Sequence, residues 1–298
     1  MAGRPLWVGI ELGGSKILCR VMDGDGHVLA DRRYHTSTPA AAVDDIAACI
    51  QPAATDGGVV VAIGVASFGP LVIDARSSRY GCLLETPKRG WSGFNIRRAL
   101  MERFDAPVII DTDVNAAALA EHIRGAGQGL RSIAYVTVGT GIGGGLATEH
   151  GLLKGALHPE IGHIRVRRRA GDVQPSTCPF HEDCAEGLAA GPAIRRRLGE
   201  SRTLMQTPAV SALIAQYLGE LAATLVLAWA PHRLVFGGGV MTAPALLGEV
   251  EKAMRESLCH YGLEDAKHPG YLVAAHLTDA GLEGALILAR SGFTGSPP

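Results

Sequence analysis

The first third of the chain alternates short apolar runs with glycine-rich turns, a pattern typical of strands joined in hairpins. The turns contain Gly13-Gly14 and Asp23-Gly-Asp-Gly26, and the strands expected on either side of them are 6–11, 17–22 and 28–34. The run 59–66 is apolar without alternation, which indicates a strand buried on both faces. This part of the chain therefore predicts a sheet.

Helical spacing of apolar residues follows in several longer segments. The helices expected from it are 40–51, 95–104, 114–124, 208–230 and 279–290. Asn95 is placed to cap the helix that follows it, because a short polar side chain there can accept from the first free backbone N–H groups. Further strands are expected at 108–110, 132–138, 143–148 and 233–236.

The order strand, glycine turn, strand occurs twice, at 6–22 and at 132–148, each time at the start of an alternating β/α series. Such a recurrence indicates two related halves. We expect an α/β protein of two domains facing a cleft, with the hinge near Asp113. A small N-terminal domain would span 1–113 and be completed by the C-terminal helix 279–291, and a larger domain would span 114–278.

Composition narrows the class of protein. The 298 residues carry a net charge of −1 and are 47% hydrophobic and 19% charged, which is ordinary for a soluble globular chain. We see no basic stripe with interleaved aromatic residues, so nucleic acid is not an expected partner. The apolar run 59–66 is far shorter than the roughly 20 residues that span a bilayer, and no signal peptide is recognisable. Six cysteines do not form a disulfide framework in a chain of this size. We expect a reduced, cytoplasmic protein without a membrane partner.

One loop concentrates the residues that bind metals. Its four candidate ligands are His163, Cys178, His181 and Cys184. Two thiolates and two imidazoles suit a tetrahedral Zn²⁺ ion, and a site with four protein ligands is structural because no position is left for chemistry. Glu160 and Glu186 flank the ligands, so a metal here would also hold two carboxylates. The alternative is a surface loop with incidental Cys and His.

Three glycine-rich turns each follow an apolar strand. They contain Gly13-Gly14-Ser15-Lys16, Gly139-Thr140-Gly141 and Gly237-Gly238-Gly239. Glycine permits positive φ and lets backbone N–H groups approach an anion, so such turns can cradle phosphates; a tight hairpin alone also needs glycine. Gly139, Gly141 and Gly144 fit the dinucleotide fingerprint G-x-G-x-x-G, but that motif needs a helix where a strand is expected at 143–148.

Asp113 is the best candidate for chemistry. It lies just past a short strand at the start of a helix, where its carboxylate would be held at a domain junction. Phosphoryl transfer to a hydroxyl needs such a carboxylate beside the hydroxyl, with donors and Mg²⁺ around the phosphates. The alternative is that Asp111 or Asp113 merely caps the helix.

Taken together, these motifs resemble the ROK family of repressors and sugar kinases, which has the actin-like ATPase (ribonuclease H-like) fold. The resemblance covers nearly the whole chain. The matching stretches are 9–16 (GIELGGSK), 111–118 (DTDVNAAA), 137–144 (TVGTGIGG), 160–163 (EIGH), 184–186 (CAE) and 236–240 (FGGGV).

The resemblance implies a role for each candidate residue. Asp113 would be the general base on a sugar hydroxyl, and the sugar would also contact Thr112, Glu160, His163 and Glu186. Residues of the first two turns would surround the phosphates of ATP with its Mg²⁺: Gly13, Gly14, Ser15, Lys16, Gly139, Thr140 and Gly141. Gly237, Gly238 and Gly239 would back the adenosine. His163 would also bind the structural zinc with Cys178, His181 and Cys184, and the protein would be a homodimer.

Some residues depart from the commonest family pattern. His181 replaces one of three cysteines, Glu11 stands where Asp is usual, and Thr112 stands where Asn is usual. Together with the segment 86–91 (TPKRGW), these resemble the fructokinase branch. We place Lys88, within that segment, in a solvated loop outside the site.

The expected function is therefore ATP-dependent phosphorylation of D-fructose to fructose 6-phosphate. A kinase for another hexose (glucose, mannose or an N-acetylhexosamine) is the main alternative. A sugar-responsive repressor would need a DNA-binding helix pair before the first strand, and the strand expected from Leu6 leaves no room for one. A non-catalytic, ATP-binding scaffold would not need Asp113 or the sugar-facing acids.

Overall fold

The computed structural model describes residues 3–199, 202–259, 261 and 264–294. The chain forms two compact units. The first unit comprises Met1–Ala120, Glu149–His158 and Leu277–Pro298, and the second comprises Glu121–Thr148 and Pro159–His276. The chain leaves the first unit within helix α3 (Asp113–Arg124), the helix whose first residue is the expected boundary.

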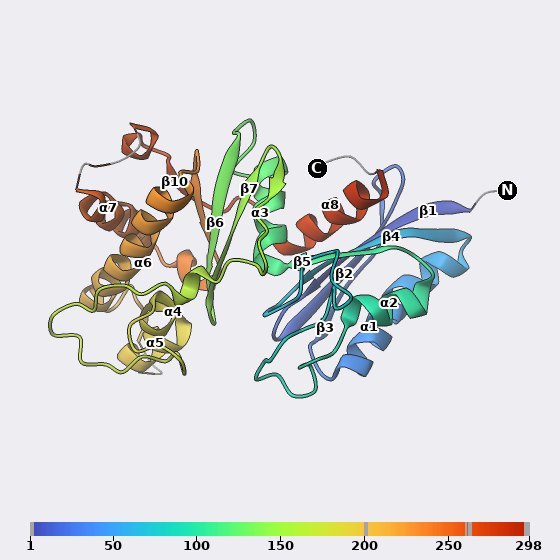
Figure 1. Ribbon diagram of the computed structural model, residues 1–298, viewed down its shortest axis with the longest axis horizontal. Coiled ribbons are helices and arrows are strands. Elements are labelled where there is room, and N and C mark those ends of the chain that lie inside the picture. Colours follow the sequence, from blue (N-terminus) through green and yellow to red (C-terminus); the bar gives the residue numbers. More distant parts are fainter. Residues whose placement is uncertain (1–2, 200–201, 260, 262–263, 295–298) are drawn as a thin grey trace. The chain divides into compact units, whose positions relative to one another are not determined.

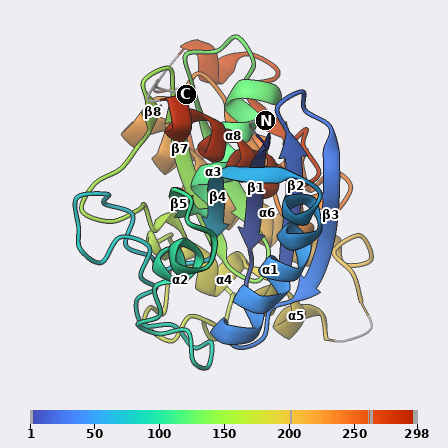
Figure 2. The ribbon, with the colours of Figure 1, turned by 90° about the vertical axis from the view of Figure 1, so that its right-hand side faces the viewer.

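The first unit is built on a sheet with strand order β3-β2-β1-β4-β5 (Figure 2). Its strands are β1 (Arg4–Leu12), β2 (Lys16–Asp23), β3 (Val28–His35), β4 (Gly58–Ser67) and β5 (Val108–Thr112). The first three strands pair antiparallel, while β1 with β4 and β4 with β5 pair parallel. Each expected strand of this region is present; buried apolar residues line β1, β2, β4 and β5, whereas β3 at the edge of the sheet has none.

Helices cover both faces of this sheet (Figure 1). α1 (Pro39–Thr55) and α2 (Ile96–Phe104) pack on one face, and α8 (Ala280–Thr294) and α3 pack on the other. Asn95 caps α2 as expected, its side chain accepting from Arg98 N at 2.9 Å. Gly64 lets α8 approach β4, because a Cβ there would lie 1.8 Å from the carbonyl oxygen of Ala285.

The second unit repeats the same plan. β6 (Ser132–Val138) pairs antiparallel with β7 (Ile142–Thr148) and parallel with β9 (Leu234–Gly237), which pairs parallel with β10 (Leu272–Ala274). A hairpin followed by parallel strands thus occurs in both sheets, in agreement with the recurrence in the sequence. The short β8 (Gly151–Leu152) lies in the segment that is grouped with the first unit.

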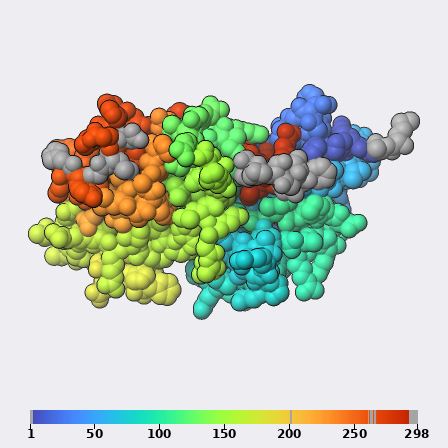
Figure 3. Space-filling view, turned by 45° about the horizontal axis from the view of Figure 1, so that its top comes forward, coloured from blue at the N-terminus to red at the C-terminus, as the bar shows by residue number. Residues whose placement is uncertain are grey.

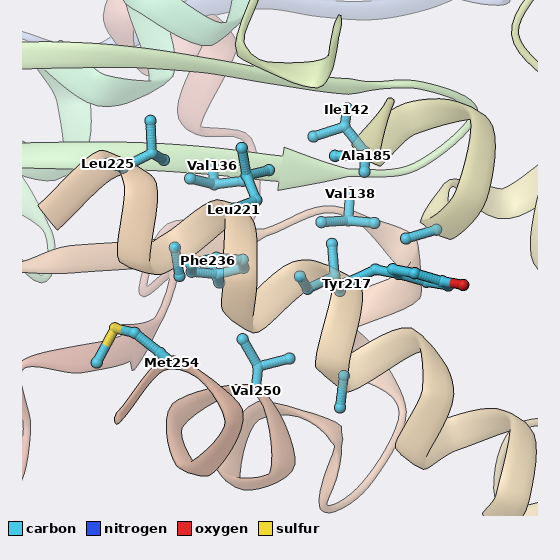
Figure 4. Packing of buried hydrophobic residues seen from close by; sticks show 14 of the residues in the cluster. Val136, Val138, Ile142, Ala185, Tyr217, Leu221, Leu225, Phe236, Val250 and Met254 are labelled. Atoms are coloured by element: carbon cyan, nitrogen blue, oxygen red, sulfur yellow. The ribbon is translucent and has the colours of Figure 1, made fainter. Parts of the chain in front are cut away.

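Two long helices pack against this second sheet, α6 (Pro208–Trp229) and α7 (Leu246–Leu258). Figure 4 shows side chains of both helices, among them Leu221 of α6 and Met254 of α7, in one buried cluster with Val136 and Phe236 of the sheet. α6 is the one described helix that is long and apolar enough to cross a membrane, but 61% of its apolar window is buried inside the unit. Its hydrophobicity is that of a core helix.

Short elements complete the second unit. They are α4 (Ala185–Ala189), α5 (Gly191–Leu198), and the 3₁₀ turns η1 (Ile161–His163), η2 (Gly239–Thr242) and η3 (Glu264–Lys267). α4 and α5 have too few residues for a periodic pattern, so the sequence did not predict them. The segment 143–148 is strand, not helix, within β7, as expected from the argument against a dinucleotide fingerprint.

Candidate active site

The first glycine turn joins β1 to β2. Gly13 N donates to Lys16 O at 2.9 Å, and Thr36 Oγ1 donates to Gly13 O at 2.8 Å, which fixes the turn from both sides. Lys88 Nζ donates to the carbonyl oxygen of Gly14. Lys88 lies in a partly exposed loop, as expected, but its side chain reaches this turn, which the sequence did not indicate. Its segment is held by the buried Trp91, whose Nε1 donates to a backbone carbonyl at 2.8 Å.

Glu11 lies beside this turn at the end of β1. Lys16 Nζ is 3.8 Å from Glu11 Oε1. Burial raises the pKa of the Glu11 carboxyl, and the charge of Lys16 and the backbone N–H of Leu282 in α8 partly oppose that shift. A cation that bound here would favour the ionised carboxylate.

The junction of β5 and α3 holds Asp113 in a defined position. Thr112 Oγ1 accepts from Asn115 N at 3.2 Å, so Thr112 caps α3. Asp113 occupies the first helical position, where its Oδ1 accepts from Val114 N at 2.9 Å. The cap is thus supplied by neither Asp111 nor Asp113.

Asp111 is fully buried directly before this cap. Its Oδ1 accepts from Thr112 N at 2.8 Å and from Asn115 Nδ2 at 2.7 Å, and its Oδ2 lies 2.7 Å from Lys154 Nζ. A buried carboxylate with this set of partners orders the backbone that presents Asp113. The sequence did not indicate that Lys154 lies beside Asp111, because Lys154 comes after β7 and Asp111 belongs to β5.

In the second unit, two glycine turns lie side by side. The turn after β6 contains Gly139, Thr140 and Gly141, and Gly139 N donates to Gly141 O at 2.9 Å. The turn after β9 contains Gly237, Gly238 and Gly239, and a Cβ at Gly238 would lie 2.4 Å from Val138 O. Gly238 is the one glycine of the three turns with positive φ, at 90°. Close approach explains Gly141, Gly237 and Gly238, whereas a Cβ at Gly14, Gly139 or Gly239 would meet no atom within 4 Å.

Glu186 contacts the turn after β6. Its Oε2 accepts from Ile142 N at 2.9 Å, and a Cβ at Gly141 would lie 2.6 Å from the same oxygen. Glu186 is carried by α4, whose N-cap is the candidate metal ligand Cys184, with Gly187 N donating to Cys184 Sγ at 3.3 Å. The structure thus brings together a carboxylate assigned to the sugar and a turn assigned to phosphates.

The four candidate metal ligands form one cluster. One ligand atom from each of His163, Cys178, His181 and Cys184 lies within 4.8 Å of the others. Cys178 Sγ is 3.7 Å from His163 Nδ1 and 3.6 Å from His181 Nδ1. Tetrahedral metal bonds of roughly 2.0–2.3 Å place neighbouring ligand atoms about 3.5 Å apart, so the two separations at Cys178 are compatible with a metal ion bound by these side chains.

The loop that carries Cys178 and His181 lies on the surface of its unit (yellow-green in Figure 3), whereas Cys184 is buried. Burial raises the pKa of the Cys184 thiol to about 11. A bound cation would have to displace its proton, as metal ligation by cysteine generally does. Glu160, exposed, precedes η1, which ends at His163.

Comparison with known proteins agrees with this arrangement. The sequence profile of the ROK family matches residues 7–291. The chain belongs to the ROK family. The fructokinase of Zymomonas mobilis subsp. mobilis is 39% identical over 287 residues, covering 94% of this chain and 95% of that protein.

Solved structures of the family share the fold. The ROK hexokinase from Thermus thermophilus superposes with a TM-score of 0.80 at 31% identity, covering 98% of this chain and 100% of that one. The ROK family glucokinase from Streptomyces griseus, solved with glucose and AMPPNP, superposes with a TM-score of 0.73 at 28% identity, covering 96% and 100%. The protein is therefore α/β with the actin-like ATPase fold of ROK sugar kinases, as the resemblance implied.

Proposed function

We propose that this ROK family protein is an ATP-dependent fructokinase that converts D-fructose to fructose 6-phosphate. The observation that carries the proposal is its 39% identity, over 94% of the chain, to the fructokinase of Zymomonas mobilis. The two kinases with solved structures are named a hexokinase and a glucokinase and are less similar, at 31% and 28% identity. A kinase for another hexose is the alternative that these structures favour.

In the proposed reaction Asp113 is the general base. Its carboxylate accepts the proton of the 6-hydroxyl as that oxygen forms a bond to the γ-phosphorus of ATP. The bond between the γ-phosphorus and the bridging oxygen breaks at the same time, and ADP leaves. The cap by Thr112 and the backbone bond to Oδ1 hold Asp113 rigid, which supports this role.

Binding roles follow from the two units taken separately. In the first unit, Gly13, Gly14, Ser15 and Lys16 contact phosphate oxygens, with Lys16 and Lys88 supplying positive charge, and Thr112 contacts the sugar. In the second unit, the turn after β6 also faces the phosphates, through Gly139, Thr140 and Gly141. The turn after β9 lies behind the adenosine, through Gly237, Gly238 and Gly239. The sugar hydroxyls are bound by Glu160, His163 and Glu186. Magnesium, bound with ATP, would neutralise the phosphate charge.

The Cys/His cluster is proposed to hold one structural zinc ion through His163, Cys178, His181 and Cys184. Zinc bound there would fix the loop before α4 and would leave no open coordination position for chemistry. We also propose that the protein is cytoplasmic and that it is a homodimer, the second of which the family resemblance implies.

The test of the proposed function is the initial rate of ADP formation with MgATP and fructose, glucose, mannose or N-acetylmannosamine in parallel. A fructose rate well above the others supports a fructokinase. If another hexose gives the highest rate, the kinase stands and the assignment to fructose is wrong. ADP formation that no sugar raises above background contradicts sugar kinase activity on these hexoses.

A further inference from the structure

Glu186 occupies a place that sugar binding alone does not require. Its Oε2 accepts from Ile142 N at 2.9 Å, across 44 residues of sequence, at the end of the glycine turn 139–141. A Cβ at Gly141 would lie 2.6 Å from this oxygen, so the turn and the carboxylate are in direct contact. Side chains beneath them also pack together, because Ile142 and Ala185 belong to one buried cluster (Figure 4).

The turn is held from the α5 side as well. Gly191 N donates to Gly139 O at 2.8 Å, and Gly139 N donates to Gly141 O at 2.9 Å. The two ends of the turn are therefore held by hydrogen bonds, one to the carboxylate of Glu186 in α4 and one from the backbone N–H of Gly191 in α5. A hydrogen bond to a charged acceptor is stronger than one to a neutral acceptor, so the bond to Glu186 is the stronger of the two.

We propose that Glu186 is a positioning residue for nucleotide: it holds the 139–141 turn in the conformation that accepts the phosphates of ATP. The inference rests on the proposed function in taking this turn as a phosphate-binding element. It adds to the sugar contact assigned to Glu186, because the same carboxylate would act on both substrates. Loss of Glu186 would then weaken nucleotide binding even when no sugar is present.

The experiment measures the Kd of MgAMPPNP without sugar by calorimetry. Glu186→Ala is expected to weaken this affinity by about tenfold, since a hydrogen bond to a charged group is lost. Glu186→Gln keeps a carbonyl acceptor for Ile142 N and is expected to lose about threefold or less. The matched control is Glu182→Ala, which removes an exposed carboxylate from the same loop and should leave the Kd unchanged. Wild-type affinity in Glu186→Ala overturns the proposal.

Gly141→Ala provides a second test, and its single variant keeps Glu186 in the chain. The added Cβ would force the Glu186 carboxylate and the turn apart, so the single variant should bind MgAMPPNP more weakly. In a Glu186→Ala background the carboxylate that this Cβ would meet is absent, so adding Gly141→Ala should change the Kd little. If each single variant raises the Kd by some factor and the double variant raises it by the product of the two factors, the proposal is overturned.

These results separate the inference from the proposed function. A wild type that makes no ADP with any hexose, but whose MgAMPPNP affinity falls in Glu186→Ala, would contradict the kinase assignment and support the positioning role. A wild type that phosphorylates fructose while Glu186→Ala binds MgAMPPNP normally would contradict the positioning role alone. A wild type that binds no MgAMPPNP would overturn both.

Discussion

Lys154 Nζ lies 2.7 Å from Oδ2 of Asp111, a carboxylate with no exposed surface. The pair ties the segment after β7 to the end of β5, two residues before Asp113. Because Asp111 is fully buried, its carboxylate oxygens depend on these protein partners in place of water.

Lys154→Met should lower the free energy of unfolding by about 2 kcal/mol, because it leaves a buried carboxylate without its cation. The measurement is the urea midpoint at unchanged m-value. Lys252→Met is the matched control, since Lys252 pairs with Glu256 on the surface and should cost well under about 1 kcal/mol. Equal midpoints for the two variants would contradict a stabilising role for Lys154. In an Asp111→Asn background, Lys154→Met should cost little.

Asp113→Asn should lower kcat by roughly 10² to 10⁴, because the amide cannot accept the hydroxyl proton, while sugar binding persists. Single-turnover rates and sugar affinity by calorimetry provide the check. Asp105→Asn is the control: Asp105 ends α2 in a left-handed conformation that Asn also tolerates. An Asp113→Asn variant that retains more than about a tenth of the wild-type rate would rule out the general base.

Metal analysis of the purified protein should give about one zinc per chain, since one ligand atom from each of four Cys and His side chains lies within 4.8 Å of the others. The Cys178→Ser, Cys184→Ser double variant should lose the metal. Cys259→Ser removes an exposed cysteine and should retain it. A metal-free wild type with full activity would refute the structural zinc site.

Glu11 should make stability depend on pH in a defined direction. Burial raises the pKa of its carboxyl above the ordinary value of 4.5, so the folded state binds the proton more tightly than the unfolded state. The contribution of Glu11 to stability is then present at low pH and is lost as pH rises from 4.5 through the raised pKa. Glu11→Gln, which stays neutral, should gain stability relative to wild type across that window.

Urea unfolding of wild type and Glu11→Gln between pH 4 and 8 measures this difference. Glu102→Gln is the control, because Glu102 is exposed and pairs with Arg98 on the same helix. A stability difference between Glu11→Gln and wild type that falls as pH rises would show that the ionised form of Glu11 is favoured in the fold.

Most strands and long helices were predictable because periodicity and turn residues are local properties. The cap of α2 by Asn95 is such a case, since the donor and the acceptor lie three residues apart. The cap of α3 was not assigned correctly, because Asp111, Thr112 and Asp113 can all act as caps and only the backbone path shows that Thr112 does. Short helices such as α4 carry too few residues for a pattern.

The candidate metal ligands and Asp113 could be proposed from residue type and position along the chain, because ligand and acid–base chemistry restrict the side chains that can serve. The sequence by itself also determined the family, since its motifs lie in unbroken stretches of the chain. It could not determine which distant residues meet. Lys88 reaches Gly14 across 74 residues and Glu186 reaches Ile142 across 44. Only the tertiary structure decided these contacts, because they depend on strand register and helix packing, which bring together residues that share no local pattern.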